Sequence, residues 1–120
     1  MIRITEENIK QFAELSGDHN PIHIDQEYAK TTAFKRRIAH GALIISYVSQ
    51  EIAKQFNNPI IKDITFTFIK PAYIGDKIRI RLTDDWSSGN RKWVHVSVKN
   101  QNKEEIITGN ACIIVRRYNE

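Results

Sequence analysis

Helical spacing of apolar residues dominates the first half of the chain. Apolar positions recur on one face between residues 9 and 15, behind Thr5, whose hydroxyl can cap a helix N-terminus. A shorter helix is expected over residues 26–31, after a capping Asp25. The run 41–56 is apolar on nearly every face in its first half. It predicts a buried central helix wrapped by other structure on most sides.

From residue 60 onward the period of the pattern changes to two. Apolar or alternating runs, each typical of a strand, lie at residues 2–4, 64–68, 78–82, 94–98 and 106–115. The last four predict a meander of antiparallel strands, and Gly109 is expected to mark a bulge. One face of this sheet should cover the central helix while the other meets solvent or a partner. The pattern therefore predicts a single α+β domain over residues 1–120.

Composition narrows the class of protein. The 120 residues are 41% hydrophobic and include one cysteine, Cys112, which excludes an intrachain disulfide. Its apolar neighbours predict a buried, inert thiol. The net charge of +4 is spread along the chain without a nucleic-acid-binding motif or a long basic stripe. No apolar stretch reaches the ~20 residues that cross a bilayer, and no signal peptide is visible. We expect a cytoplasmic protein that binds neither nucleic acid nor membrane.

The candidate chemistry lies in residues 16–23, Ser-Gly-Asp-His-Asn-Pro-Ile-His. Asp18 and His23 flank Pro21, which has no N–H and restricts the residue before it. This segment is expected to be an ordered loop that presents an acid and a base to one point, where they can hold a water molecule. Gly41 opens the buried helix, whose free N–H groups can polarise a carbonyl oxygen. Together these groups point to addition or removal of water beside a carbonyl.

Simpler or different roles exist for the same residues. Asp18 can cap a turn, and His40 can cap or brace the central helix. Two histidines four residues apart, His19 and His23, beside Asp18 and Asp25 also suggest zinc. That spacing serves a metal only on a helix, which Pro21 should break, so we expect no metal.

Three segments resemble the MaoC-like branch of the hotdog fold, the (R)-specific enoyl-CoA hydratases and 3-hydroxyacyl dehydratases. They are residues 12–23, residues 39–43 and residues 68–76. The resemblance implies a single hotdog domain in which an antiparallel sheet wraps one long central helix. It implies that Asp18 and His23 are the catalytic pair and that Gly41 donates its N–H to the thioester oxygen. Supporting residues would be Ser49, Asn20 and His40.

The resemblance also implies an activity. This is (R)-specific hydration of trans-2-enoyl thioesters, or the reverse dehydration, by a homodimer or dimer of dimers whose sites lie at the subunit interface. The acyl group would arrive as a thioester of coenzyme A or of an acyl carrier protein, with Arg36, Lys70 and Arg91 as candidates to meet the phosphates, and no metal or redox cofactor is expected. The main alternative is a 3-hydroxyacyl-carrier-protein dehydratase of fatty-acid or polyketide synthesis. A hotdog thioesterase ranks lower because the central helix offers only Glu51, and a non-catalytic acyl-binding subunit is the last alternative.

Overall fold

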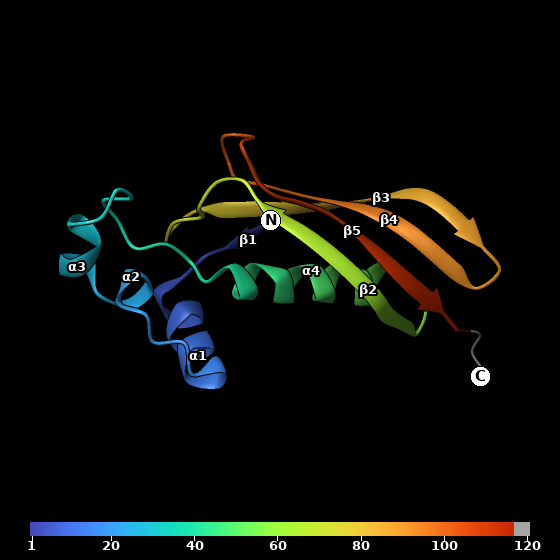
Figure 1. The fold of residues 1–120 in the computed structure, drawn as a ribbon, viewed down its shortest axis with the longest axis horizontal. Coiled ribbons are helices and arrows are strands. Elements are labelled where there is room, and N and C mark those ends of the chain that lie inside the picture. Colours follow the sequence, from blue (N-terminus) through green and yellow to red (C-terminus); the bar gives the residue numbers. More distant parts are fainter. Residues whose placement is uncertain (117–120) are drawn as a thin grey trace.

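The fold is a curved antiparallel sheet that lies over one long helix, with three shorter helices packed at one end (Figure 1). A computed structural model describes residues 1–116. The elements in chain order are β1 (Ile2–Arg3), α1 (Glu6–Ser16), α2 (Pro21–Ile24), α3 (Gln26–Lys30), α4 (Gly41–Gln55), β2 (Pro59–Phe68), β3 (Lys77–Ser88), β4 (Arg91–Lys99) and β5 (Glu105–Val115). The α+β class predicted from the sequence is confirmed.

The ends of the first helix follow local chemistry. Thr5 Oγ1 accepts a hydrogen bond from the Asn8 amide, and the Asn8 side chain accepts one from the Thr5 amide, which forms a capping box. Gly17 ends α1 in the left-handed region at φ +78°, where glycine meets no steric penalty. These ends fix the point at which the chain leaves α1 and turns toward Asp18.

Pro21 begins a helix, so the expected irregular loop over residues 16–23 is only partly present. Proline suits the first helical position, because its missing N–H would have no partner there and its φ is already helical. Asn20 caps this one-turn helix, α2, by accepting a hydrogen bond from the Ile22 amide. His23 therefore lies on α2, and only residues 17–20 connect α1 to it.

The sheet order is β1-β3-β4-β5-β2, with every neighbouring pair antiparallel. Only β3, β4 and β5 form a meander. The predicted four-stranded meander is wrong at β2, which lies beyond β5 and does not pair with β3. Within the described residues, β2 is thus one edge of the sheet, and the other is β3, of which β1 covers only Lys77 and Ile78.

Gly109 is not a bulge, contrary to the expectation from sequence. It is in register opposite Phe66, and a Cβ there would lie 2.2 Å from the Thr65 carbonyl oxygen. The glycine instead permits close approach of β2 to β5. Register shifts occur elsewhere, between Ile61 and Asp63 in β2 and in two other strand pairs.

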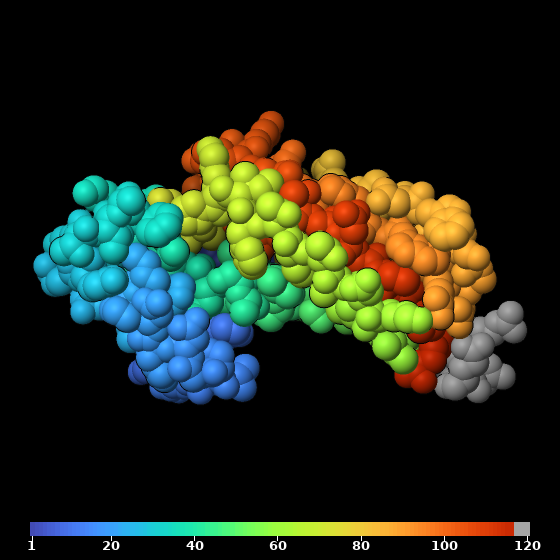
Figure 2. Space-filling model, viewed as in Figure 1, coloured from blue at the N-terminus to red at the C-terminus, as the bar shows by residue number. Residues whose placement is uncertain are grey.

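The core lies between α4 and the concave face of the sheet. Four residues of α4 are buried (Leu43, Ile44, Val48 and Ile52), and three valines of β4 lie opposite (Val94, Val96 and Val98). The other face of α4 is open, with Ala42, Ser46 and Ser49 exposed. The prediction that structure wraps this helix on most sides is therefore wrong for a single chain. Figure 2 shows part of its green surface between the N-terminal helices and β2.

Two expectations drawn from composition can be compared with the structure. Cys112 is half-buried in β5 and not fully buried as predicted. None of the helices in residues 1–116 is both long and apolar enough to cross a bilayer.

Candidate active site

Asp18 is held by hydrogen bonds at the exit of α1. Ser16 Oγ accepts a hydrogen bond from the Asp18 amide at 3.1 Å, and Asp18 Oδ1 accepts one from the Asn20 amide at 3.2 Å. The second contact is an Asx turn, a local motif typical of aspartate. It leaves Oδ2 available to face His23, so the capping role and a catalytic role are compatible.

His23 is held through its other ring nitrogen. Its Nδ1 lies 2.8 Å from the carbonyl oxygen of Ile38. A carbonyl oxygen only accepts hydrogen bonds, so Nδ1 carries the proton and donates it. In the neutral imidazole, Nε2 is then unprotonated and can act as a base. The ring is 11% exposed, which leaves only its edge accessible.

The two predicted catalytic groups face each other. Asp18 Oδ2 lies 3.8 Å from His23 Nε2, and the Asp18 side chain is half exposed. This separation is too long for a direct hydrogen bond. A water molecule about 2.8 Å from both atoms would fit between them. The pair is thus spaced to share one water molecule.

His40 supports this pair from the buried side. Its ring stacks on His23, with centroids 3.9 Å apart and planes 26° apart, and its Nε2 donates to the Asp18 carbonyl oxygen at 3.0 Å. Burial lowers the pKa of His40 below its usual 6.5, against the opposing effect of that hydrogen bond. Its Nδ1 is buried without a partner among the described residues. A neutral His40 fits this environment, because an unpaired buried N–H would be costly.

The structure also tests the zinc alternative. The predicted set does not assemble, since His19 is exposed and lines a separate hollow while Asp25 caps α3. A different trio, Asp18, His23 and His40, brings its ligand atoms within 4.8 Å of one another. In this trio His23 Nδ1 and His40 Nε2 already donate to the Ile38 and Asp18 carbonyl oxygens, which leaves one ring nitrogen on each histidine.

An apolar cavity of about 530 Å³ opens beside the pair. His23 and Gly41 both contribute to its wall, and most of the rest is apolar (Phe34, Ile38, Ala39, Ala42, Ile44, Phe68, Ile69, Pro71, Ala72 and Ile106, with Lys70). We call this cavity the acyl cleft. Gly41 is the first residue of α4, and its N–H has no acceptor in residues 1–116. The apolar wall, the His23 ring and the free N–H of Gly41 therefore face the same cavity.

Glycine at position 41 has a steric reason. A Cβ there would lie 2.5 Å from Cε1 of Phe68, so the ring of Phe68 packs directly on the Gly41 backbone. The close packing keeps this wall of the cleft near the amide. The contact between Phe68 and Gly41 joins the end of β2 to the start of α4.

The predicted supporting residues have different positions. Asn20 caps α2 and so positions His23. Ser49 is exposed on α4, about 12 Å along the helix from Gly41, and its hydroxyl makes no hydrogen bond within the described chain. Its support of Asp18 stays a prediction.

Arg37 is a supporting residue that sequence reasoning missed. Its Nε donates to the His23 carbonyl oxygen at 2.7 Å, and its two terminal nitrogens form a bidentate pair with Glu6 at 2.8 and 2.9 Å. The clamp ties α2 to the start of α1, which orients the His23 backbone. Only the contiguous basic residues around position 37 were visible in the sequence, and nothing in their spacing links them to Glu6.

Fold and site together define an enzyme-like domain in which His23, one member of an acid/base pair with Asp18, lines an apolar cleft. Residues 1–107 match the family model described as MaoC like domain, so the chain belongs to the MaoC-like family. The R-hydratase of Pseudomonas aeruginosa has a similar structure (TM-score 0.90, 34% identity, covering 97% of this chain and 77% of that one). So does the (R)-hydratase of A. caviae (TM-score 0.87, 28% identity, covering 96% and 90%). The predicted hotdog fold is confirmed.

Two relatives illustrate the activities named in the family. The chain is 33% identical over 116 residues to the mitochondrial 3-hydroxyacyl-acyl-carrier-protein dehydratase of Arabidopsis thaliana, covering 92% of this chain and 70% of the relative. It is 39% identical over 82 residues to the (R)-specific enoyl-CoA hydratase of Rhodospirillum rubrum, covering 67% of this chain and 57% of the relative. The family and both activity names are those predicted from the sequence motifs.

Proposed function

We propose that this protein is a hydro-lyase that hydrates trans-2-enoyl thioesters to (R)-3-hydroxyacyl thioesters or catalyses the reverse dehydration. One observation carries the proposal. Asp18 Oδ2 and His23 Nε2 lie 3.8 Å apart, and His23 lines an apolar cleft together with Gly41, whose N–H has no acceptor in residues 1–116. The names of the relatives support the same chemistry.

The hydration step follows from this arrangement. A water molecule donates hydrogen bonds to Asp18 and His23, and its oxygen attacks the β-carbon of the enoyl group while the pair removes one proton. Electrons move to the thioester oxygen, where the Gly41 N–H stabilises the enolate. The pair then returns its proton to the α-carbon, so that H and OH have been added in total. Dehydration uses the same steps in reverse, and neither direction needs a metal or redox cofactor.

The acyl cleft accounts for substrate class. Its apolar wall suits a hydrocarbon chain, whereas its volume of about 530 Å³ falls within the range of small-molecule sites. With the thioester carbonyl at Gly41, the acyl chain would lie against the apolar wall of this cleft.

A second copy of the chain would complete the site. Asp18 is half exposed, α4 has an open face, and β2 presents a ten-residue free edge with apolar Ile60 and Phe68 exposed nearby. Such an edge is a ready surface for pairing with another chain. We propose a homodimer joined along β2, alone or as a dimer of dimers. Size-exclusion chromatography with light scattering should give at least twice the mass of one chain, and a stable, active monomer would contradict this assembly.

Hydration of crotonyl-CoA, followed by loss of enoyl absorbance, tests the activity. Asp18→Asn and His23→Ala should each lower kcat by about 10² to 10⁴. His19→Ala and Asp85→Asn are matched controls, because both residues are exposed and neither forms an ion pair with His23, as Asp18 does. Near-wild-type turnover by either site variant would refute the catalytic assignment.

A carrier-protein dehydratase remains the second candidate, because the Arabidopsis relative carries that name. Turnover of one enoyl group offered on coenzyme A and on acyl carrier protein separates the two candidates. Release of free thiol would instead identify a thioesterase, and binding without turnover an acyl-binding subunit. A cytoplasmic location is part of this proposal, to be tested by cell fractionation.

A further inference from the structure

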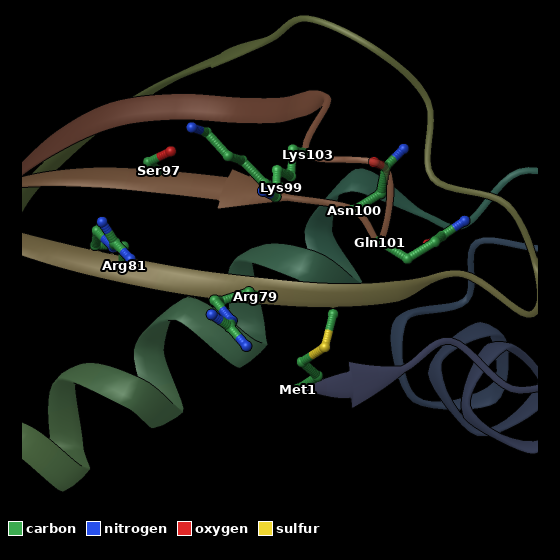
Figure 3. A pocket seen from close by; sticks show the side chains of 8 residues that line it. All are labelled: Met1, Arg79, Arg81, Ser97, Lys99, Asn100, Gln101 and Lys103. Carbon is green, nitrogen blue, oxygen red and sulfur yellow. The ribbon is translucent and has the colours of Figure 1, made fainter.

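The convex face of the sheet carries four cations around a hollow of about 330 Å³ (Figure 3). Arg79 and Arg81 alternate along β3 with Ile78, which is buried against the core, so they point away from α4. Lys99 comes from the neighbouring strand β4, and Lys103 from the turn that follows it. We call this hollow the basic pocket. Its other lining residues are Met1, Ser97, Asn100 and Gln101.

These four cations form no ion pair within 4 Å in residues 1–116, although Glu105 is the cross-strand partner of Lys99 on β5. None of them forms an ion pair or a side-chain hydrogen bond there, whereas Lys30, Arg37 and Lys70 each pair with a glutamate. Arg79 and Lys99 are direct cross-strand partners, an arrangement that destabilises a sheet when both charges are alike. The carboxylate at the border, Glu105, accepts a hydrogen bond from Ser97. A bound anion would relieve the repulsion among the cations.

The wall that presents Lys103 is held in one conformation. Lys103 has φ +62°, an unusual value for a lysine, and its amide donates to the Asn100 carbonyl oxygen. Asn100 is buried, and its Oδ1 accepts hydrogen bonds from the amides of Asn102 and Glu104. Gln101 Nε2 donates to Asp76, which joins this turn to the one before β3. These hydrogen bonds fix the backbone of the turn that carries Lys103 at the edge of the basic pocket.

A chain of hollows links the basic pocket to the acyl cleft. A hollow of about 180 Å³ shares Asn100 and Gln101 with the basic pocket and shares Lys70 and Pro71 with the cleft. Three strand spacings, about 14 Å, separate β2 at the cleft from β3 at the basic pocket. An extended arm can follow these hollows around the end of the sheet.

We infer that the basic pocket binds the nucleotide phosphates of a coenzyme A thioester whose acyl group occupies the cleft. This inference rests on the proposed function. The phosphate-binding cations would then be Arg79, Arg81, Lys99 and Lys103 instead of the Arg36, Lys70 and Arg91 expected from the sequence. Arg91 lies at the opposite end of β4, about 27 Å from Lys99 along the strand, and Lys70 is already paired with Glu104. Arg36 stacks over the Tyr73 ring at 3.8 Å and lines the connecting hollow.

Calorimetry with adenosine 3′,5′-bisphosphate tests the pocket without requiring turnover. The double variant Arg79→Gln/Lys99→Gln should bind this probe about tenfold or more weakly, because two charge-assisted contacts are lost. The control Lys54→Gln/Arg91→Gln removes the same charge from exposed positions outside the pocket and should bind as the wild type does. Equal binding by the wild type and the pocket variant, or no binding by the wild type at millimolar probe, would overturn the inference.

Kinetics then connect the pocket to the substrate. The pocket variant should raise the KM for crotonyl-CoA about tenfold with kcat within about twofold, since the phosphates lie far from the reacting carbons. The crotonyl thioester of N-acetylcysteamine, which has no phosphate, should keep its KM. An equal rise for both thioesters would contradict phosphate recognition, and loss of turnover only on a carrier-protein thioester would reassign the pocket to protein docking. A protein inactive on both thioesters whose bisphosphate binding is still lost in the variant would refute the hydratase proposal and support the phosphate site.

Discussion

Replacing Gly41 by alanine separates catalysis from folding. The new Cβ would lie 2.5 Å from Cε1 and 2.9 Å from Cζ of Phe68, whereas ordinary contact starts at 3.4 Å. The ring edge must therefore retreat by about 0.9 Å, or the start of α4 must move by the same amount. Phe68 is 56% exposed and can turn away from the new methyl group. The free energy of unfolding should change little.

The catalytic rate of the Gly41→Ala variant should fall. The Gly41 N–H and the Phe68 ring line the cleft side by side, so a shift of about 1 Å displaces the thioester oxygen from its donor. Misplacement of that size can cost about 10² in rate. We expect kcat/KM for crotonyl-CoA hydration to fall by about 10- to 100-fold in Gly41→Ala.

Adding Phe68→Ala to Gly41→Ala removes the side chain that the new methyl group would meet. The Gly41→Ala/Phe68→Ala double variant has room for the new methyl group, so it should recover most of the activity relative to Phe68→Ala alone. Thermal unfolding of all three proteins provides the control for folding. Full activity of Gly41→Ala, or a double variant no better than Gly41→Ala, would show that contact with Phe68 is not why glycine stands at this position.

Three further predictions address the scaffold around the site. Gly109→Ala places a Cβ 2.2 Å from the Thr65 carbonyl oxygen, a backbone atom that cannot turn aside. Denaturant titration should therefore show that the free energy of unfolding falls by about 3 kcal/mol or more. An unchanged unfolding midpoint would mean that β2 does not approach β5 this closely. Arg37→Met removes the donor to the His23 carbonyl and should lower kcat about tenfold with a smaller change in unfolding free energy, whereas an unchanged kcat would make the clamp purely structural. Burial lowers the pKa of His40, so the unfolded chain takes up its proton first as the pH falls below 6.5 and stability declines toward the lowered value. Melting temperatures measured from about pH 7 to about pH 5 should therefore fall more steeply in the wild type than in His40→Gln, and parallel slopes would contradict the burial effect.

Local motifs made the N-terminal half predictable. Thr5, Gly17 and Asp25 each mark a helix end through contacts within three or four residues of themselves. Asp18 and His23 could be paired from the sequence for a similar reason, because only a short segment containing Asn20 and Pro21 connects them. The helical start at Pro21 was missed, since proline both ends helices and begins them.

Distant contacts explain most of what the sequence did not reveal. Arg37 reaches Glu6 across 31 residues, and β2 joins the sheet beside β5 instead of beside its successor β3. Gly109 is a further example. A glycine inside a strand pattern suggested a bulge, whereas its role depends on β2, a strand more than forty residues earlier in the chain. Alternation of apolar residues reports which face of a strand is buried and carries no information on which strand lies next to it.

The sequence alone determined every element except α2, the segment that carries the carboxylate and imidazole, and the family to which the chain belongs. These depend on interactions between near neighbours in the chain, which residue type and spacing record directly. Only the tertiary structure decided which ring nitrogen of His23 donates to the Ile38 carbonyl, the closeness of Gly41 to Phe68, and the gathering of four cations from β3, β4 and a turn. Each of these requires parts of the chain far apart in sequence to pack at one distance and in one register, and packing of that kind is set by the whole fold.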